Sequence, residues 1–545
     1  MKSIIEFRNI TYKVKKRFIL KNINGVIRIN KCMLIMGPSG CGKTSLLKII
    51  SGRNLQSFEG SVQWNIGEEK LEDISGYIHQ DDIFDSNMTV EENIKYSGDL
   101  RSGKCCVDNV MSKLSLHQVK HRTIQENSNL KISGGEAKRV AIAMELIRDP
   151  DILFLDEPTS GLDSYNALKL VTYLKELSEY KTIVATIHQP SADIFFSFDD
   201  VLLIGTESRL VYQGETSNII EVLFKEGVII PLYCNPIDYI LQSEIMKISK
   251  TIIYYKKNTC HGVEPIRRRR ISNLRKKKIT ISNQILIIMK KEVIALSRNK
   301  FSLILIFFQS FILSFFIGII FYNIPSKPLF IQYKNTIGFL GFLSMTVLFS
   351  PSFSTINNFQ KNLPLVKRQV QAKYYNVISY MAVRLIIESV INTLQPIIIA
   401  MVTYLLVLYP MYSSIQFMKF LCLTILTQHI GLSLGFLISS CCPNLNLALF
   451  VAPSFLLLLI ITNGLMIDPY LLLEPFKTLQ YISPARHTFN GYVKIHFSNQ
   501  SIFDVNIYNL VNRFLSIGQS FLVLGMIYII CISFTFIVLF KKLKM

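Results

Sequence analysis

The sequence predicts two parts of different fold class: an α/β phosphate-loop nucleotide-binding domain, followed by an all-α transmembrane domain of six helices. Three observations predict this arrangement. A glycine-rich phosphate-binding motif lies between an apolar run of strand length and a helical stretch, a second apolar run ends in two carboxylates, and apolar stretches of about 20 residues fill the second half. At 545 residues the chain is also too long for one ordinary domain.

The phosphate-binding motif has the pattern G-x-x-x-x-G-K-[ST] and follows the apolar run Cys32–Met36. Its glycines let the backbone curl so that N–H groups point at a polyphosphate, and the helix N-terminus that follows adds partial positive charge. We expect Lys43 to reach the β- and γ-phosphates of ATP and Thr44 to hold Mg²⁺. The predicted nucleotide-binding residues of this loop are Gly37, Pro38, Ser39, Gly40, Cys41, Gly42, Lys43 and Thr44.

Two other residues are candidates for the same site because of where they fall in the chain. Tyr12 follows the alternating run Ile4–Ile10, which predicts a half-buried strand, and its ring could stack on adenine. An edge-strand tyrosine without a ligand fits the residue type about as well. Gln80 follows the short predicted strand Ser75–Ile78. Its amide offers both an acceptor and donors for Mg²⁺ and the attacking water, and the alternative is an ordinary loop glutamine.

A second phosphate-type element occurs where Ser-Gly-Gly-Glu opens a predicted helix. Backbone N–H groups at a helix N-terminus favour an anion. This element cannot serve the γ-phosphate held by Lys43 while also lying on a separate subdomain, so a second copy of the domain facing the first would solve the geometry. Its residues are Ser133, Gly134, Gly135 and Glu136.

The apolar run Ile152–Leu155 ends in two carboxylates, Asp156 and Glu157. Asp156 occupies the place of a Mg²⁺ ligand in phosphate-loop ATPases, and Glu157 is placed to polarise water as a general base. The alternative is a solvated acidic strand end. His188 follows the next buried-strand run and could bond the γ-phosphate and orient the water, although a lone histidine has no role in most contexts.

The second half of the chain contains six predicted membrane spans, near residues 302–322, 336–356, 377–408, 418–441, 446–466 and 517–540. Ile281–Ser297 is amphipathic and suits a helix lying at the membrane surface, while a plain flank of the first span fits comparably well. The expected domains are a nucleotide-binding domain at 1–245, a polybasic linker at 246–281, an amphipathic connecting helix at 282–300, and a transmembrane domain at 301–545 with an outer segment at 467–516.

The chain is strongly basic, with 59 Lys and Arg residues against 38 Asp and Glu residues. Such a balance is typical of contact with nucleic acid or with an anionic membrane face. Here Lys and Arg gather beside the apolar stretches and at the C-terminus. This pattern disfavours nucleic acid and predicts a multi-pass membrane protein with both termini in the cytoplasm. The N-terminus has no secretory signal pattern, and the ten cysteines show no metal-ligand spacing.

Several polar residues of the second half are candidates for a substrate pathway. Arg384 and Glu388 are four residues apart and could pair on one helix face, either at membrane depth or at the interface. Gln428 and His429 are pathway candidates or interhelical hydrogen bonders. Asn499 begins an N-glycosylation triplet, which is a common chance pattern.

The ordered motifs of the first half resemble the nucleotide-binding domain of ABC transporters. They are the Gly37–Thr44 loop, Gln80, Ile132–Glu136, Leu155–Asp163 and Ile187–Pro190. The resemblance implies that Ser133, Gly134 and Gly135 form the signature that closes on ATP bound by a partner domain. It also implies that Asp163 belongs to the dimer-contact loop and that His188 is the switch histidine.

The domain order resembles the G (White) subfamily, whose half-transporters place one nucleotide domain before one membrane domain. Thr186–Pro190, Asn235–Tyr239 and Asn463–Met466 also look like that subfamily. The resemblance implies that Leu465 and Met466 form an upper gate of the translocation path. Two departures stand out: the outer-loop cysteines of the family are absent, and Asn362–Gln369 lacks the usual acidic residues.

Together, these features predict an ATP-driven half-transporter that works as a homodimer or as a heterodimer with another half-transporter. By resemblance, we expect it to move a lipid-like or amphipathic substrate across a membrane, as an exporter. The expected cofactors are ATP and Mg²⁺, and the expected partners include membrane lipid but no nucleic acid. The alternative is a membrane-anchored, ATP-dependent regulator or assembly factor that moves no solute.

Overall fold

The computed structural model divides the chain into two compact units, Met1–Ile279 and Thr280–Met545. The polybasic run Arg267–Arg270 lies outside the described residues. The structure describes residues 3–15, 17–53, 57–67, 70–80, 84–85, 87–101, 107–124, 132–225, 236–242, 252–254, 279–322, 324–326, 328–409, 412–463, 465, 473–474, 476–499 and 515–544.

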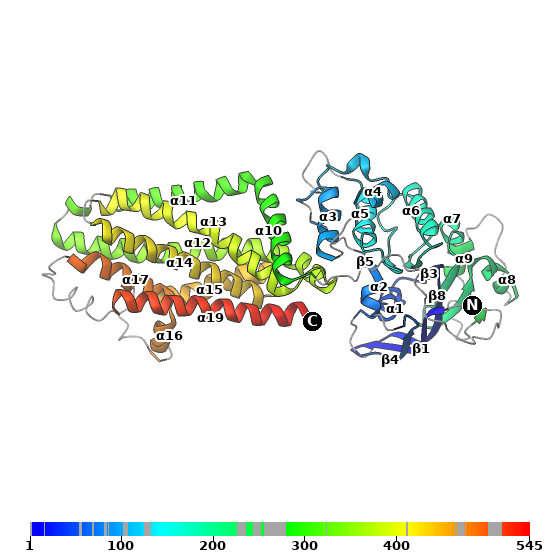
Figure 1. Cartoon of the computed structure of the whole chain (residues 1–545). Coiled ribbons are helices and arrows are strands. Elements are labelled where there is room, and N and C mark those ends of the chain that lie inside the picture. Colours follow the sequence, from blue (N-terminus) through cyan, green and yellow to red (C-terminus); the bar gives the residue numbers. More distant parts are fainter. Residues whose placement is uncertain are drawn as a thin grey trace. The chain divides into compact units, whose positions relative to one another are not determined.

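The first unit is built on a seven-stranded sheet with the order β10-β9-β8-β3-β7-β6-β5 (Figure 1). Neighbouring strands are parallel except for β8 and β9, which are antiparallel. The strands are β3 (Cys32–Met36), β5 (Ser75–Ile78), β6 (Ile152–Asp156), β7 (Thr182–Thr186), β8 (Asp200–Ile204), β9 (Leu210–Glu215) and β10 (Ile252–Tyr254).

A smaller antiparallel sheet with the order β2-β1-β4 belongs to the same unit. It consists of β1 (Ser3–Val14), β2 (Arg17–Arg28) and β4 (Glu59–Trp64). The helices of the unit are α1 (Lys43–Ile50), α2 (Leu71–Ile74), α3 (Val90–Arg101), α4 (Val107–Lys113), α5 (Gly134–Leu146), α6 (Ser164–Leu177), α7 (Ala192–Phe196), α8 (Ile219–Lys225) and α9 (Pro236–Gln242), with 3₁₀ turns at His117–Val119 and Thr216–Asn218. The predicted α/β class is therefore confirmed.

The centre of the large sheet brings the predicted motifs together. Strands β3, β6, β7 and β8 are buried along their whole length, as expected for parallel strands covered on both faces. Because β7 lies between β3 and β6, and β6 pairs with β5, the segments that follow these four strands leave the sheet at one edge. Ligands of open α/β sheets bind at such carboxyl ends.

The second unit is helical (Figure 1). Helix α10 crosses the ends of α11 and α13 at a steep angle, whereas the long helices run side by side. The helices are α10 (Ile281–Arg298), α11 (Lys300–Ile320), α12 (Leu329–Gln371), α13 (Val377–Thr403), α14 (Ser414–Cys441), α15 (Leu445–Ile461), α16 (Phe476–Ile482), α17 (Pro484–His496) and α19 (Ile517–Lys544). A π-helical turn at Tyr404–Leu408 continues α13, and 3₁₀ turns lie at Ile324–Ser326 and Phe497–Asn499.

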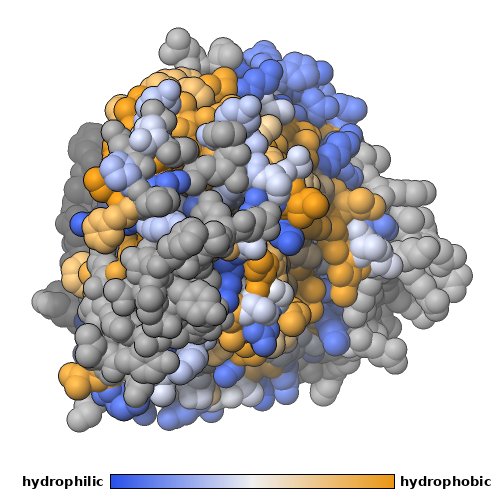
Figure 2. All heavy atoms as spheres, turned by 90° about the vertical axis from the view of Figure 1, so that its left-hand side faces the viewer, coloured by the Kyte–Doolittle hydropathy of each residue, from blue (hydrophilic) through white to orange (hydrophobic). Residues whose placement is uncertain are grey.

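Among the described residues, five helices are long and apolar enough to cross a membrane. They correspond to the first four predicted spans and to the last one. The predicted span near 446–466 is shorter in the structure, because helix α15 ends at Ile461. The helix of the second predicted span, α12, is longer than expected and continues to Gln371. Lys361, Lys367 and Arg368, which follow the predicted span, therefore belong to this helix, whereas Lys373 lies beyond its end. Figure 2 shows hydrophobic side chains at the surface of this unit.

The sequence pattern puts Ile288 and Val293 on the apolar side of the amphipathic helix α10 and Lys291 elsewhere, and the structure differs from that prediction at two positions. Ile288 is buried as expected, whereas Val293 is 53% exposed. Lys291, predicted to lie on the polar side, is buried, and its ammonium lies 3.9 Å from the Glu292 carboxylate. A buried lysine requires such a partner, because an unpaired charge is costly to remove from water.

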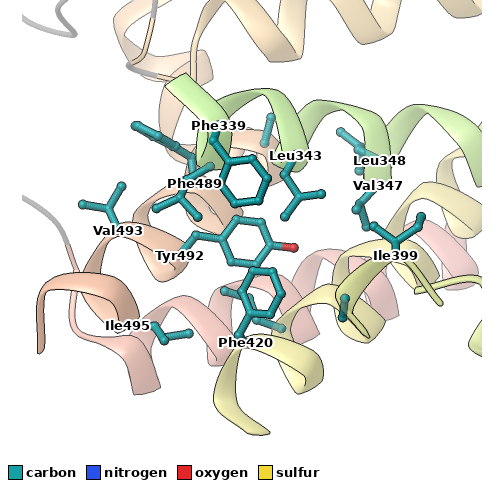
Figure 3. Close-up of a cluster of buried hydrophobic side chains, with 14 of the residues drawn as sticks. Phe339, Leu343, Val347, Leu348, Ile399, Phe420, Phe489, Tyr492, Val493 and Ile495 are labelled. Carbon is teal, nitrogen blue, oxygen red and sulfur yellow. The ribbon is translucent and has the colours of Figure 1, made fainter. Parts of the chain in front are cut away.

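An aromatic cluster holds three helices of the second unit together (Figure 3). Phe339 of α12, Phe420 of α14 and Tyr492 of α17 are among its fully buried side chains. The Tyr492 hydroxyl donates a hydrogen bond to Thr424 Oγ1 at 3.0 Å, which satisfies its polar tip inside the cluster. Gly431 allows α12 and α14 to approach closely, because a Cβ there would lie 2.4 Å from the Leu348 carbonyl oxygen.

Candidate functional site

The phosphate-binding loop connects β3 to α1, as the motif predicts. At two of its glycines, a side chain would clash with the backbone of neighbouring segments. A Cβ at Gly37 would lie 2.3 Å from the Ile204 carbonyl oxygen, and a Cβ at Gly42 would lie 2.7 Å from that of Ile19. Gly42 also has a φ of 100°, a conformation that other residues rarely adopt. Pro38, Ser39, Gly40 and Cys41 complete the loop, and burial raises the pKa of the Cys41 thiol.

Lys43 and Thr44 open helix α1 directly after the loop. The buried Lys43 ammonium donates hydrogen bonds to the carbonyl oxygens of Gly37 at 2.8 Å and Pro38 at 3.0 Å. These contacts hold a positive charge against the loop. The Thr44 hydroxyl donates to Asp156 Oδ1 at 2.9 Å, which places two of the three predicted Mg²⁺ ligands, Thr44 and Asp156, next to each other.

The two carboxylates lie at the end of β6, where the chain leaves the sheet. Asp156 is the last residue of the strand and is buried, whereas Glu157 is half-buried and has a positive φ of 49°. Gln80, which follows β5, donates from Nε2 to Glu157 Oε2 at 2.9 Å. The structure thus brings Lys43, Thr44, Gln80, Asp156 and Glu157 together, although they span more than 110 residues of sequence.

Three residues of this site escaped the sequence analysis. The Tyr77 hydroxyl lies 3.4 Å from Asp156 Oδ2 as a donor, and burial raises the pKa of this tyrosine, so the hydroxyl keeps its proton. The Thr186 hydroxyl donates to Asp156 Oδ1 at 2.9 Å. The Lys138 ammonium donates to the Gln80 carbonyl oxygen. Tyr77 and Thr186 lie near the ends of predicted strands, and Thr186 also begins the family-like segment Thr186–Pro190, but neither signal assigns a role to the hydroxyl.

The Ser133–Glu136 element begins helix α5. Ser133 is its N-cap, its hydroxyl accepts from the Glu136 N–H at 3.2 Å, and the Glu136 carboxylate accepts from the Ser133 N–H at 2.6 Å. Ser133 and Gly134 are exposed, and Gly135 is buried. Within the described part of the chain, no hydrogen bond or ion pair joins this element to residues 37–44.

Asp163 caps helix α6 and is exposed. Its carboxylate accepts hydrogen bonds from Asn166, and this contact holds the pKa of Asp163 below its usual range. The preceding Gly161 lies against the signature element, since a Cβ on Gly134 would be 3.3 Å from the Gly161 carbonyl oxygen. The two surface segments predicted to contact a partner domain are therefore neighbours.

The remaining two candidates differ in accessibility. His188 lies two residues after β7, half-buried, at the same sheet edge as Asp156, because Asp156 pairs with Thr186 across the two strands. Tyr12 lies in β1, is only 6% exposed and packs in the hydrophobic core of the first unit. Its ring is thus not presented to solvent in this structure, and its stacking on adenine stays a prediction.

The donor set at the sheet edge fits Mg²⁺ chemically. A hydroxyl and a carboxylate oxygen are ligands that Mg²⁺ takes when substrate phosphates and waters supply the rest. Across the described residues, no group of three or more His, Cys, Asp or Glu side chains forms a metal cluster. An ion here would therefore depend on the nucleotide for its remaining ligands.

The polar candidates of the second unit form interhelical contacts. Arg384 pairs with Glu388 at 2.8 Å, as predicted from their spacing, and with Glu292 of α10 at 3.3 Å. Gln428 donates to Gln395 at 2.6 Å, and His429 contacts Thr393 at 3.4 Å, so both link α14 to α13. Leu465 packs close to α12 at Gly341, whereas Met466 and the side chain of Asn499 lie outside the described residues.

The fold and the site define a phosphate-loop ATPase joined to a helical membrane domain. Two family models match the chain: the ABC transporter model at residues 20–160 and the ABC-2 type transporter model at residues 283–497. Together they cover more than half of the chain in this order. The chain belongs to the ABC transporters, with the ATP-binding domain first as in the White, or G, subfamily, and it is an ABC-type ATPase.

Two similar proteins match nearly the whole chain, and a third matches a shorter part of it at higher identity. The chain is 27% identical to protein white of Drosophila melanogaster over 520 residues, which cover 87% of this chain and 74% of that protein. It is 27% identical to the ABC transporter ATP-binding protein/permease wht-1 of Caenorhabditis elegans, over 89% of this chain and 78% of the relative. The ABC-type transporter claG of Penicillium crustosum is 41% identical over 227 residues, 39% of this chain and 30% of the relative.

Proposed function

We propose that the protein is an ATP-driven half-transporter that acts as a dimer and exports a lipid-like or amphipathic substrate. The observation that carries this proposal is the meeting of Lys43, Thr44, Asp156, Glu157 and Gln80 at one sheet edge, in a chain whose second part matches a transporter membrane domain. The nature of the substrate and the export direction rest on the resemblance to the G subfamily.

In the proposed mechanism, each side chain of the site has a defined task. The loop N–H groups and Lys43 would bind the phosphates. Thr44 and Asp156 would hold Mg²⁺, and the ion would supply charge neutralisation on the phosphate oxygens. Glu157 accepts a proton from the attacking water, while Gln80 and His188 orient that water. Gln80 is suited to this task because its amide already contacts Glu157 at 2.9 Å.

Dimerisation completes the site in this proposal. The exposed Ser133 and Gly134 and the neighbouring Asp163 loop would close on ATP held by a second copy. Closure would depend on contacts that exist only with the γ-phosphate present, so hydrolysis would return the membrane helices to their first arrangement. Both halves of the composite site occur in this chain, which makes a homodimer feasible, and a heterodimer is the other outcome of the test. The proposal also places both termini in the cytoplasm, because Lys and Arg gather beside the apolar stretches and at the C-terminus.

The decisive experiment measures flux. Purified protein in lipid vesicles is expected to move a lipid or amphipathic substrate on addition of ATP and Mg²⁺, and a panel of such compounds is expected to contain one that stimulates hydrolysis. Hydrolysis without vectorial flux for any compound would favour the second candidate, an ATP-dependent membrane regulator or assembly factor.

Replacing Lys43 by alanine is expected to weaken ATP binding by about 10- to 100-fold, because a charged hydrogen-bond donor to the phosphates contributes roughly 1.5–3 kcal/mol. The measurement is the dissociation constant for ATP of the full-length protein in nanodiscs. Lys48→Ala is the matched control, since Lys48 is a half-buried cation of the same helix one turn farther from the loop. An equal loss of ATP affinity in both variants would show that Lys43 has no specific role in binding the phosphates.

A further inference from the structure

The last residue of β7, Thr186, uses its hydroxyl twice at the hydrolysis site. The hydroxyl donates to Asp156 Oδ1 at 2.9 Å and accepts the backbone N–H of Glu157 at 2.9 Å. The side chain is fully buried. A threonine hydroxyl has one proton to donate and lone pairs to accept. One buried group therefore connects two consecutive residues, the proposed metal ligand and the proposed base.

Both residues need such a restraint. Glu157 has a φ of 49°, in the left-handed region that a residue with a side chain rarely adopts, so its backbone requires contacts that keep it there. Asp156 Oδ1 also accepts from Thr44, and Asp156 Oδ2 faces the Tyr77 hydroxyl. Hydroxyl donors on both oxygens orient the carboxylate, as partners of metal ligands do in other sites.

We propose that Thr186 is a positioning residue for ATP hydrolysis, whose hydroxyl holds Asp156 and Glu157 in one fixed relative geometry. The inference rests on the proposed roles of Asp156 and Glu157. In this proposal, Thr186 acts through Asp156 and Glu157 and has no contact of its own with the nucleotide or the attacking water. Its loss would loosen the metal ligand and the base together, while the loop residues that bind the phosphates would keep their contacts.

The same strand provides a control for simple structural effects. Thr182 lies at the other end of β7, is 1% exposed, and its hydroxyl accepts the Asn30 N–H at 3.0 Å. Thr182→Val and Thr186→Val both remove a buried hydroxyl that accepts a backbone N–H, but only Thr186→Val also removes a hydroxyl that donates to Asp156. A difference in activity or metal affinity between the two variants therefore reflects the contact with Asp156 and not the general loss of a buried hydroxyl.

The experiment uses the full-length protein in nanodiscs with Thr186→Val, Thr186→Ser and Thr182→Val. Two quantities are measured: kcat and KM for ATP hydrolysis, and the affinity for Mn²⁺ in the presence of a non-hydrolysable ATP analogue, followed by electron paramagnetic resonance. Thr186→Val is expected to lose about 10- to 100-fold in both kcat and Mn²⁺ affinity, the usual effect of removing a partner of a metal ligand. KM for ATP is expected to change little, and Thr186→Ser and Thr182→Val are expected to resemble the wild type.

The serine and valine variants separate positioning from packing, because valine keeps the shape of threonine and serine keeps the hydroxyl. If Thr186 served only packing, Thr186→Ser would lose more kcat and Mn²⁺ affinity than Thr186→Val, and this result would overturn the inference. Equal Mn²⁺ affinity in Thr186→Val and Thr182→Val would also overturn it. A wild-type protein that hydrolyses no ATP would count against the proposed function instead, and the Mn²⁺ measurement would still decide the role of Thr186.

Discussion

Glu157→Gln protein is expected to bind ATP almost normally and to lose steady-state hydrolysis by about 10²- to 10⁴-fold, the range ascribed to a general base. The change keeps the shape of the side chain, and the amide oxygen can still accept the hydrogen bond that Gln80 donates to Glu157 at 2.9 Å. It removes only the ability to take a proton from water. The site is therefore expected to remain assembled around ATP without turning it over.

The measurement combines ATP binding with phosphate release by purified protein in nanodiscs. Glu179→Gln is the control, since Glu179 is an exposed carboxylate after α6, outside the site. We also expect Glu157→Gln to accumulate as an ATP-bound dimer, because hydrolysis no longer reopens it. Sustained hydrolysis by this variant would show that another group accepts the proton.

Arg384→Met is expected to destabilise the second unit by about 3–5 kcal/mol, the cost of breaking a buried ion pair by removing one partner. Arg384 is 7% exposed and contacts the carboxylates of Glu388 on α13 and Glu292 on α10. Without it, Glu388, which is 4% exposed, would keep only the hydrogen bond from Asn392 at 3.2 Å. The ion pair that joins Arg384 to Glu292 of α10 would be lost at the same time.

Unfolding by denaturant in mixed micelles measures this effect. The exposed Lys361→Met of α12 is the control for loss of a cation and is expected to change stability little. The double variant Arg384→Met, Glu388→Met is expected to regain most of the lost stability, because an apolar pair of similar volume replaces the ion pair. If the single and double variants were equally unstable, the pairing with Glu388 would not explain the loss.

Much of the local structure follows from neighbouring residues. Thr89 and Glu92 cap helix α3 reciprocally, as their spacing predicts, and Ser133 with Glu136 does the same for α5. The glycines of the phosphate-binding loop and the apolar runs around it predict the strand, the loop and the helix. Such features depend on residues within one turn or one strand, so they can be read without knowing the fold.

The membrane part was predicted less completely, for a physical reason. Hydrophobicity marks where a helix can cross a bilayer, but it does not mark where the helix ends. Helix α12 therefore runs through polar sequence to Gln371, and α15 ends at Ile461 before its apolar stretch does. The pairing of Arg384 with Glu388 was predictable from spacing, whereas the contact with Glu292, 92 residues away, was not.

From the amino acids alone come the motifs, their order, the two fold classes and most of the candidate residues of the ATP site. The order of strands in the sheet is set by packing between distant segments, and it places Thr186 beside Asp156 and Lys138 against Gln80. A buried strand shows in sequence as an apolar run, yet any such run could pair with any other. Which hydroxyl supports which carboxylate is therefore known only once the strands are seen side by side.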